Sequence, residues 1–217
     1  MMNKGADIPL LLFAKAPIAG KVKTRLTTHC TPLQAAKIAE ILIDRSLHAA
    51  TEYWPGSVCL SVWQDQDHAF INSMLNKYGV NLISQKDGDL GEKMHGSFEE
   101  VGYPAAIMGC DAPLIPPKYF IQAYRYLELN KNVIGPSEDG GYYLIGLSAA
   151  KPDLFSNVSW GAEVVLKETL AIAREKAIEL NQLPYCFDVD RWSDLMRASE
   201  AIASLKRYLV AQRLYDR

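Results

Sequence analysis

The chain has 217 residues, of which 49% are hydrophobic and 22% are charged, and its formal net charge is -2. This composition suits one large folded domain over residues 1–217 and excludes a disordered chain. The near-neutral charge argues against the broad basic surface of nucleic-acid-binding proteins. Four widely spaced cysteines without a CxxC pair argue against a zinc site and indicate a cytoplasmic protein. The first apolar run, 8–14, is too short to span a membrane.

Short apolar runs alternate with amphipathic segments along the whole chain. The runs of strand length cover 10–14, 57–63, 80–84, 105–109, 132–135 and 142–147. Helices are expected over 33–47, 67–78, 91–100, 117–130, 161–179 and 192–215. Thr31, Pro32 and Gln34 form the N-cap, N1 proline and capping-box partner of the first helix. The alternation predicts a three-layer α/β/α, Rossmann-like fold with a mostly parallel sheet, whose ligands bind at the carboxyl ends of the strands.

A basic loop follows the first predicted strand. Residues 15–25 contain a glycine, Gly20, and four cations, namely Lys15, Lys21, Lys23 and Arg25. Backbone N–H groups, lysine charges and an arginine fork suit a polyphosphate at such a strand-to-helix loop. The spacing does not match a Walker A loop. The alternative is a solvated basic turn.

Asp111 directly follows the predicted strand 105–109 and precedes a proline turn. A carboxylate there is well placed to hold Mg²⁺ beside substrate phosphates, because Mg²⁺ favours one or two carboxylates together with phosphate oxygens. An Asx turn or a helix cap would explain the same residues. Asp188 and Asp190 occupy alternate positions of a later extended run, so both could approach one metal ion, although an isolated acidic pair is more often solvated.

Two glycine-rich segments carry further polar groups. The segment 135–143 includes Asp139, Gly140, Gly141 and Tyr142, which fit a hairpin turn, an acceptor site or both. The segment 87–93 either receives a base or ribose or caps the helix that follows it.

Together these segments resemble a known family. The ordered set consists of FAKAP…G…KTRL from Phe13, GDLGEKM from Gly88, GCDAP from Gly109, GP…DGGYYLIG from Gly135, WGAE from Trp160 and DVD from Asp188. It resembles a bacterial family of glycosyltransferase-A-like (GT-A) proteins, also called radical-SAM/selenodomain-associated transferases. That family is similar to the 2-phospho-L-lactate guanylyltransferases and lies in the nucleotide-diphospho-sugar transferase superfamily. The resemblance runs from about 9 to 195, with Cys110 and Ala112 in place of small polar residues.

The resemblance implies roles for individual residues. It implies nucleotide binding by Lys15, Gly20, Lys23, Arg25, Gly91, Glu92 and Lys93. It implies a metal site at Asp111, with Asp188 or Asp190 as a second ligand. Acceptor or sugar contacts would come from Asp139, Gly140, Gly141, Tyr142, Trp160 and Glu163, and the catalytic set would be Lys23, Arg25, Asp111 and Asp139.

The expected function is therefore group transfer assisted by Mg²⁺ (or Mn²⁺), from a nucleoside triphosphate or a nucleotide sugar to a small-molecule acceptor. Four cations favour a triphosphate, whereas the resemblance favours a nucleotide sugar. The alternative is a non-catalytic nucleotide-binding protein with the same fold. The last predicted helix, with Leu205, Leu209 and Leu214, packs either on its own domain or on a second copy in a homodimer.

Overall fold

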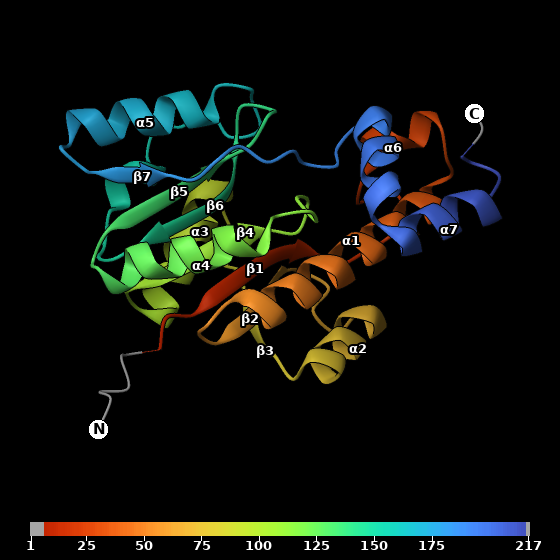
Figure 1. Cartoon of the computed structure of the whole chain (residues 1–217), viewed down its shortest axis with the longest axis horizontal. Helices are drawn as coiled ribbons and strands as arrows, with labels where there is room; N and C mark the ends of the chain where they lie inside the picture. Colours follow the sequence, from red (N-terminus) through yellow and green to blue (C-terminus); the bar gives the residue numbers. More distant parts are fainter. Residues whose placement is uncertain (1–6, 216–217) are drawn as a thin grey trace.

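The computed structural model describes residues 7–215 and is built around one seven-stranded sheet (Figure 1). The strands run in the order β3-β2-β1-β4-β6-β5-β7. Their bounds are β1 Leu10–Lys15, β2 Val58–Trp63, β3 Asn81–Ser84, β4 Ala105–Gly109, β5 Asn132–Pro136, β6 Tyr142–Leu147 and β7 Leu180–Gln182. All pairings are parallel except those of β6, which is antiparallel to both β4 and β5. The predicted mostly parallel sheet is confirmed.

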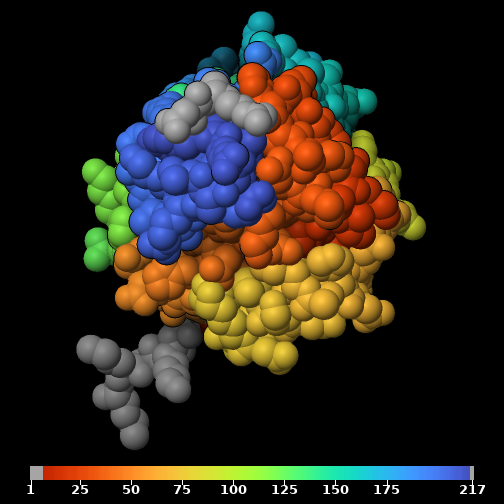
Figure 2. Space-filling view, turned by 90° about the vertical axis from the view of Figure 1, so that its right-hand side faces the viewer, coloured from red at the N-terminus to blue at the C-terminus, as the bar shows by residue number. Residues whose placement is uncertain are grey.

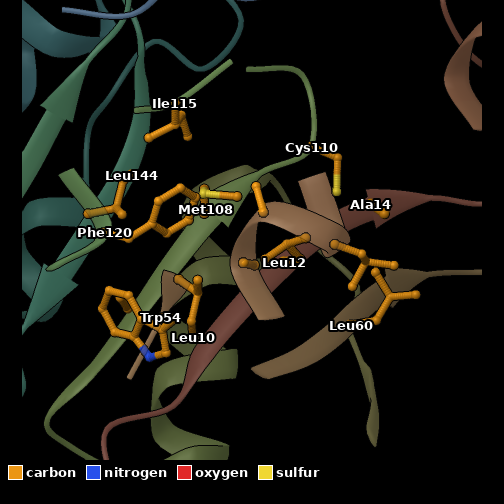
Figure 3. Packing of buried hydrophobic residues seen from close by; sticks show 14 of the residues in the cluster. Leu10, Leu12, Ala14, Trp54, Leu60, Met108, Cys110, Ile115, Phe120 and Leu144 are labelled. Atoms are coloured by element: carbon orange, nitrogen blue, oxygen red, sulfur yellow. The ribbon is translucent and has the colours of Figure 1, made fainter. Parts of the chain in front are cut away.

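Helices cover both faces of the sheet, as the predicted three layers require (Figure 1). One face packs against α1 Pro32–Tyr53, α2 Ala69–Tyr78 and α4 Pro117–Glu128. The other packs against α3 Leu90–Val101, α5 Val165–Glu175 and the 3₁₀ helix η2 Pro152–Phe155. Successive strand residues point to opposite faces, so Leu10 and Leu12 of β1 join the first layer and Leu11 joins the second. Figure 3 shows the first layer, where the sheet meets Phe120 and Trp54.

The start of α1 follows the predicted capping box. The Thr31 hydroxyl accepts from the Gln34 amide, and the Gln34 side chain accepts from the Thr31 amide at 2.9 Å. Two N–H groups that the helix leaves unpaired are thereby satisfied. A short 3₁₀ helix, η1 Thr24–Thr28, precedes α1 and carries the end of the basic loop.

The C-terminal part differs from the prediction of one helix over 192–215. It forms two helices, α6 Trp192–Ala201 and α7 Ala203–Ala211, which break at Ile202 (φ −106°, ψ 94°). The break lets both helices bury apolar residues against η1 and the first turns of α1, so Leu205, Leu209 and Leu214 pack within their own chain. Figures 1 and 2 show this blue helix pair beside the red-orange segment that contains η1 and the start of α1.

The predicted helix 161–179 is also shorter, because α5 ends at Glu175 and the short strand β7 follows it. After β7 the chain runs along the carboxyl ends of β5 and β4. The Cys186 amide donates to the Pro136 carbonyl at 3.1 Å, and the Val189 amide donates to the Asp111 carbonyl at 2.8 Å. This crossing segment brings residues 186–190 to the edge of the sheet where ligands are expected. None of the helices within residues 7–215 is long and apolar enough to cross a membrane.

Candidate functional site

Two adjoining cavities lie at the carboxyl ends of the strands. We call them the basic cavity, with a volume of about 650 Å³, and the acidic cavity, of about 580 Å³. They share a wall made by Arg25, Leu90, Trp160, Gly161 and Asp190. Both volumes are typical of small-molecule sites, and the shared residues place the two cavities side by side.

The basic cavity lies at the ends of β1, β2 and β4. Its wall carries five cations, namely Lys15, Lys21, Lys23, Arg25 and Lys93, and only two carboxylates, Asp111 and Asp190. Trp63 ends β2 and lies under the Lys93 ammonium, which is 3.8 Å from the centre of the indole ring. Such an excess of positive charge, beside the aromatic rings of Trp63 and of Trp160 in the shared wall, suits an anion attached to a planar ring.

Lys23 and Asp111 meet in this cavity, although 88 residues separate them. The Lys23 ammonium lies 2.6 Å from the Asp111 carboxylate and donates to the Val189 carbonyl at 2.7 Å. The Lys23 side chain is 7% exposed, whereas that of Asp111 is 60% exposed. Lys23 therefore holds the crossing segment and orients a carboxylate that still faces solvent. The exposed side chain of Lys15, in contrast, is free to meet a ligand.

Asp188 and Asp190 both line the acidic cavity, as their alternate positions suggested, but their surroundings differ. Asp190 forms an ion pair with Arg25 in the wall between the cavities. Asp188 is half-buried in the acidic cavity, and its burial and the charges of Asp139 and Asp111 raise its pKa to about 7. Burial is the largest cause of this rise, and the charge of Lys23 and a hydrogen bond from Ser137 offset only part of it.

A divalent cation would be held by Asp111 and Asp188, whose charges act on each other, whereas Asp190 is paired with Arg25. Asp111 is paired with Lys23 through one oxygen, so its other carboxylate oxygen would be the ligand. Carboxylate oxygens are the ligands that Mg²⁺ and Mn²⁺ take. The charges of Asp139 and Asp111, which after burial raise the pKa of Asp188, are charges that a cation would offset. In residues 7–215 no cluster of three or more His, Cys, Asp or Glu side chains forms a complete ligand set. The two carboxylates would therefore hold a metal ion only together with substrate phosphates or water, which is the usual mode for Mg²⁺.

The acidic cavity is built around the loop between β5 and β6. Asp139 lies in this loop and accepts from the Gly141 amide at 3.0 Å and from the Ser137 hydroxyl, so the hairpin turn also fixes a carboxylate. Tyr142 and Trp160 meet edge to face, with ring centres 6.4 Å apart. The aromatic pair forms an apolar wall beside the carboxylates.

Four of the predicted site residues do not line either cavity: Gly20, Gly91, Glu92 and Gly140. Gly91 is buried, and a Cβ there would lie 2.7 Å from the Trp160 ring, so this glycine lets Trp160 pack against α3. The Glu92 carboxylate is used by the capping box with Asp89. Gly140 has φ +90°, and a Cβ would lie 2.0 Å from the Glu163 carbonyl, so it brings Glu163 close to the hairpin loop. For these residues the helix-cap and turn interpretations describe the structure.

The structure adds residues that the sequence reading did not assign to the site. Trp63 ends β2, and Gln85 directly follows β3. Phe187 lies in the crossing segment, and Arg191 and Asp194 lie at the start of α6. Trp63 could have been found, since it stands at a strand's carboxyl end like Lys15 and Asp111. The α6 residues carried no such signal, because only tertiary packing brings this helix to the cavity.

The comparisons with known proteins agree with this architecture. A bacterial family described as "Uncharacterized protein conserved in bacteria (DUF2064)" matches residues 46–162, which is more than half of the chain and includes Asp111 and Asp139. The chain belongs to this family. No curated protein sequence matches this DUF2064 protein.

Solved structures share the fold over nearly the whole chain. A "putative nucleotide-diphospho-sugar transferase" from Desulfovibrio desulfuricans G20 is 28% identical, with a TM-score of 0.82, over 95% of this chain and 97% of that one. A nucleotidyl transferase from Methanothermobacter is 14% identical, with a TM-score of 0.60, over 92% and 99%. Rv0371c from Mycobacterium tuberculosis H37Rv, solved with manganese, is 13% identical, with a TM-score of 0.58, over 90% and 100%. The predicted nucleotide-diphospho-sugar transferase fold is confirmed.

Proposed function

We propose that this protein is a transferase that binds a nucleotide donor in the basic cavity and passes part of it to an acceptor in the acidic cavity. The observation that carries the proposal is the shared wall of two cavities of opposite charge, with Asp111 beside the cations. The donor's phosphates would meet Lys15, Lys21 and Arg25, and the base would lie beside the Trp63 indole, one face of which Lys93 covers.

Each residue of the basic cavity has a defined task in this proposal. Lys15 and Arg25 would hold the phosphates of the donor and offset the negative charge that grows on the leaving group. Lys23 would keep Asp111 pointing into the cavity, because it ties that carboxylate to the Val189 carbonyl. A divalent cation held by Asp111 and Asp188 would, when bound, supply further charge stabilisation. The manganese bound by Rv0371c supports a divalent metal in this fold.

The donor is either a nucleoside triphosphate or a nucleotide sugar. The five cations suit the larger charge of a triphosphate, and the neighbour from Methanothermobacter is a nucleotidyl transferase. The neighbour from Desulfovibrio desulfuricans, in contrast, is described as a nucleotide-diphospho-sugar transferase, which favours a nucleotide sugar. Both donors would place phosphates in the same cavity, so ligand binding distinguishes them.

A thermal-shift screen tests the proposal directly. Nucleoside triphosphates and nucleotide sugars are added with Mn²⁺, with Mg²⁺ and with a chelator, and a ligand at a hundred times its Kd should stabilise the protein by about 2.7 kcal/mol. We expect a metal-dependent shift with one of the two ligand classes. Turnover of that ligand is then followed by chromatography in the presence of acceptors. The absence of any nucleotide-dependent shift contradicts the proposal, and binding without turnover supports the non-catalytic alternative.

A further inference from the structure

We propose that the acceptor is an uncharged or amine-bearing polyhydroxyl compound that reacts through a hydroxyl group, and that phosphorylated or carboxylated acceptors are rejected. The inference rests on the proposed function and names the substrate class for the acidic cavity. Neither donor class decides whether the acceptor reacts through a phosphate or through a hydroxyl group. The acidic cavity can decide this, because an acceptor phosphate and an acceptor hydroxyl need opposite surroundings.

The charges of the cavity wall give the first argument. Its wall contains two guanidinium groups, Arg25 and Arg191, against six carboxylates: Glu138, Asp139, Glu163, Asp188, Asp190 and Asp194. Arg25 lies in the shared wall, where it pairs with Asp190 and is assigned to the donor's phosphates, and the exposed Arg191 lies 3.9 Å from Glu163. An anionic acceptor would meet three times as many carboxylates as guanidinium groups, and such like-charge contacts oppose association.

A metal ion does not reverse this balance. A divalent cation at Asp111 and Asp188 would offset two negative charges, yet Asp139, Glu163 and Asp194 would remain on the wall. Glu138 contributes less negative charge than these three, because Arg197, which does not line the cavity, donates two hydrogen bonds of 2.8 and 3.2 Å to its carboxylate. The cavity therefore keeps an excess of hydrogen-bond acceptors over donors, which matches a ligand rich in hydroxyl or ammonium donors.

The aromatic side chains give the second, independent argument. Tyr142, Trp160 and Phe187 all line the cavity, and Phe187 is backed by the Arg197 guanidinium at 3.8 Å from its ring centre. Flat apolar faces beside a few convergent polar groups are the usual wall for a compact organic ligand rather than for a free ion. A sugar or polyol offers both C–H surfaces and hydroxyl groups, so it uses both parts of this wall.

The chemistry balances with such an acceptor. An acceptor hydroxyl oxygen forms a bond to the transferred group while the bond from that group to the donor's phosphate oxygen breaks. The electron pair of the broken bond stays on the leaving phosphate, and the hydroxyl proton passes to a carboxylate of the acidic cavity. Asp139 suits this role, because the hairpin loop fixes its carboxylate through the Gly141 amide.

Saturation-transfer NMR on the full chain tests the proposal with sets of matched probes. Each set has a neutral sugar, its amino sugar and its 6-phosphate: glucose, glucosamine and glucose 6-phosphate, with the same sets for galactose and mannose. We expect neutral or amino members to bind at least tenfold more tightly than the phosphate. In the Asp139→Asn/Glu163→Gln double variant this preference should shrink, whereas Glu175→Gln on the exposed side of α5 should leave it unchanged.

A preference for the phosphates, or no saturation transfer to any probe, would overturn the inference. The probes are read without nucleotide, so this result does not depend on the donor. Failure of the proposed function has a different signature, because then no nucleotide stabilises the protein whatever the sugars do. An unchanged preference in the double variant would also count against the acidic cavity as the cause.

Discussion

The two cavities share a wall but differ in charge and in origin. The basic cavity has five cations and two carboxylates, mostly from the ends of β1, β2 and β4, while the acidic cavity has six carboxylates and two guanidinium groups, mostly from late segments. Group transfer needs this kind of difference, because phosphates must be held on one side and an acceptor must be bound on the other. Asp111, with Lys23 beneath it, lies where the basic cavity approaches the crossing segment.

The largest expected effect comes from Asp111→Asn. The change removes the exposed carboxylate beside the cations, and we expect metal-dependent turnover to fall at least about 100-fold, the scale for a lost charge-stabilising group. It also leaves the buried Lys23 ammonium without its ionic partner, so the protein should lose about 1–3 kcal/mol of stability. Steady-state turnover and urea unfolding measure the two effects. Asp67→Asn, at an exposed position, is the control, and equal turnover in both variants would remove Asp111 from the mechanism.

Lys15→Ala tests whether the basic cavity alone binds the nucleotide. Loss of one charge-assisted hydrogen bond should weaken nucleotide binding by about 1.5–3 kcal/mol, or roughly 10- to 150-fold in Kd. Calorimetric titration gives the Kd, with Lys131→Ala as the matched surface control. Glu163→Gln in the acidic cavity should leave nucleotide affinity unchanged. The reverse result, in which Glu163→Gln weakens nucleotide binding and Lys15→Ala does not, would exchange the roles of the two cavities.

The raised pKa of Asp188 predicts that the stability of the chelator-treated protein depends on pH. Its folded pKa of about 7 lies above the ordinary value of 3.8, so the folded state binds the proton more tightly than the unfolded state. Its contribution is full below pH 4 and is lost as the pH rises toward and through 7. Between pH 5 and 8 the loss is on the order of 2 kcal/mol. Urea unfolding of Asp188→Asn should show a flatter pH profile over this range, and an unaltered profile would contradict the assigned surroundings of Asp188.

The smallest expected effect compares two glycines with positive φ. Gly140→Ala brings a Cβ against the Glu163 carbonyl, whereas Gly79→Ala at the end of α2 meets nothing within 4 Å. Both should lose about 1 kcal/mol from backbone strain, and Gly140→Ala should lose about 1–2 kcal/mol more because the loop must move. Chemical unfolding separates them. Equal losses would show that the hairpin loop does not depend on this close approach.

The sequence predicts the basic cavity better than the acidic one. Lys15, the basic loop and Asp111 stand immediately after buried strands, so the sheet rule finds them from local patterns. The acidic cavity also needs the crossing segment and α6, which lie more than 45 residues beyond Asp139 in sequence. The break at Ile202 and the strand β7 escaped prediction for a similar reason: tertiary burial, rather than a proline or glycine signal, decides them.

Local patterns also assigned to nucleotide binding some residues that have another task in the structure. Gly91 and Glu92 stand next to Lys93, which does line the basic cavity, but helix capping and the packing of Trp160 account for both. Lys23 was expected as a phosphate ligand like its neighbours. Its left-handed backbone (φ 46°) begins η1, and its side chain is buried against Asp111. Spacing alone does not separate a cation that meets the ligand from one that orients a carboxylate.

The most direct test of the account is a crystal structure with Mn²⁺ and the nucleotide selected by the thermal-shift screen. The anomalous signal of manganese locates the ion without assumptions about the ligand. We predict a manganese ion coordinated by the Asp111 carboxylate. The nucleotide's phosphates should lie between this ion and Lys15. A nucleotide whose phosphates lie in the acidic cavity, or a manganese ion away from Asp111, would contradict the account.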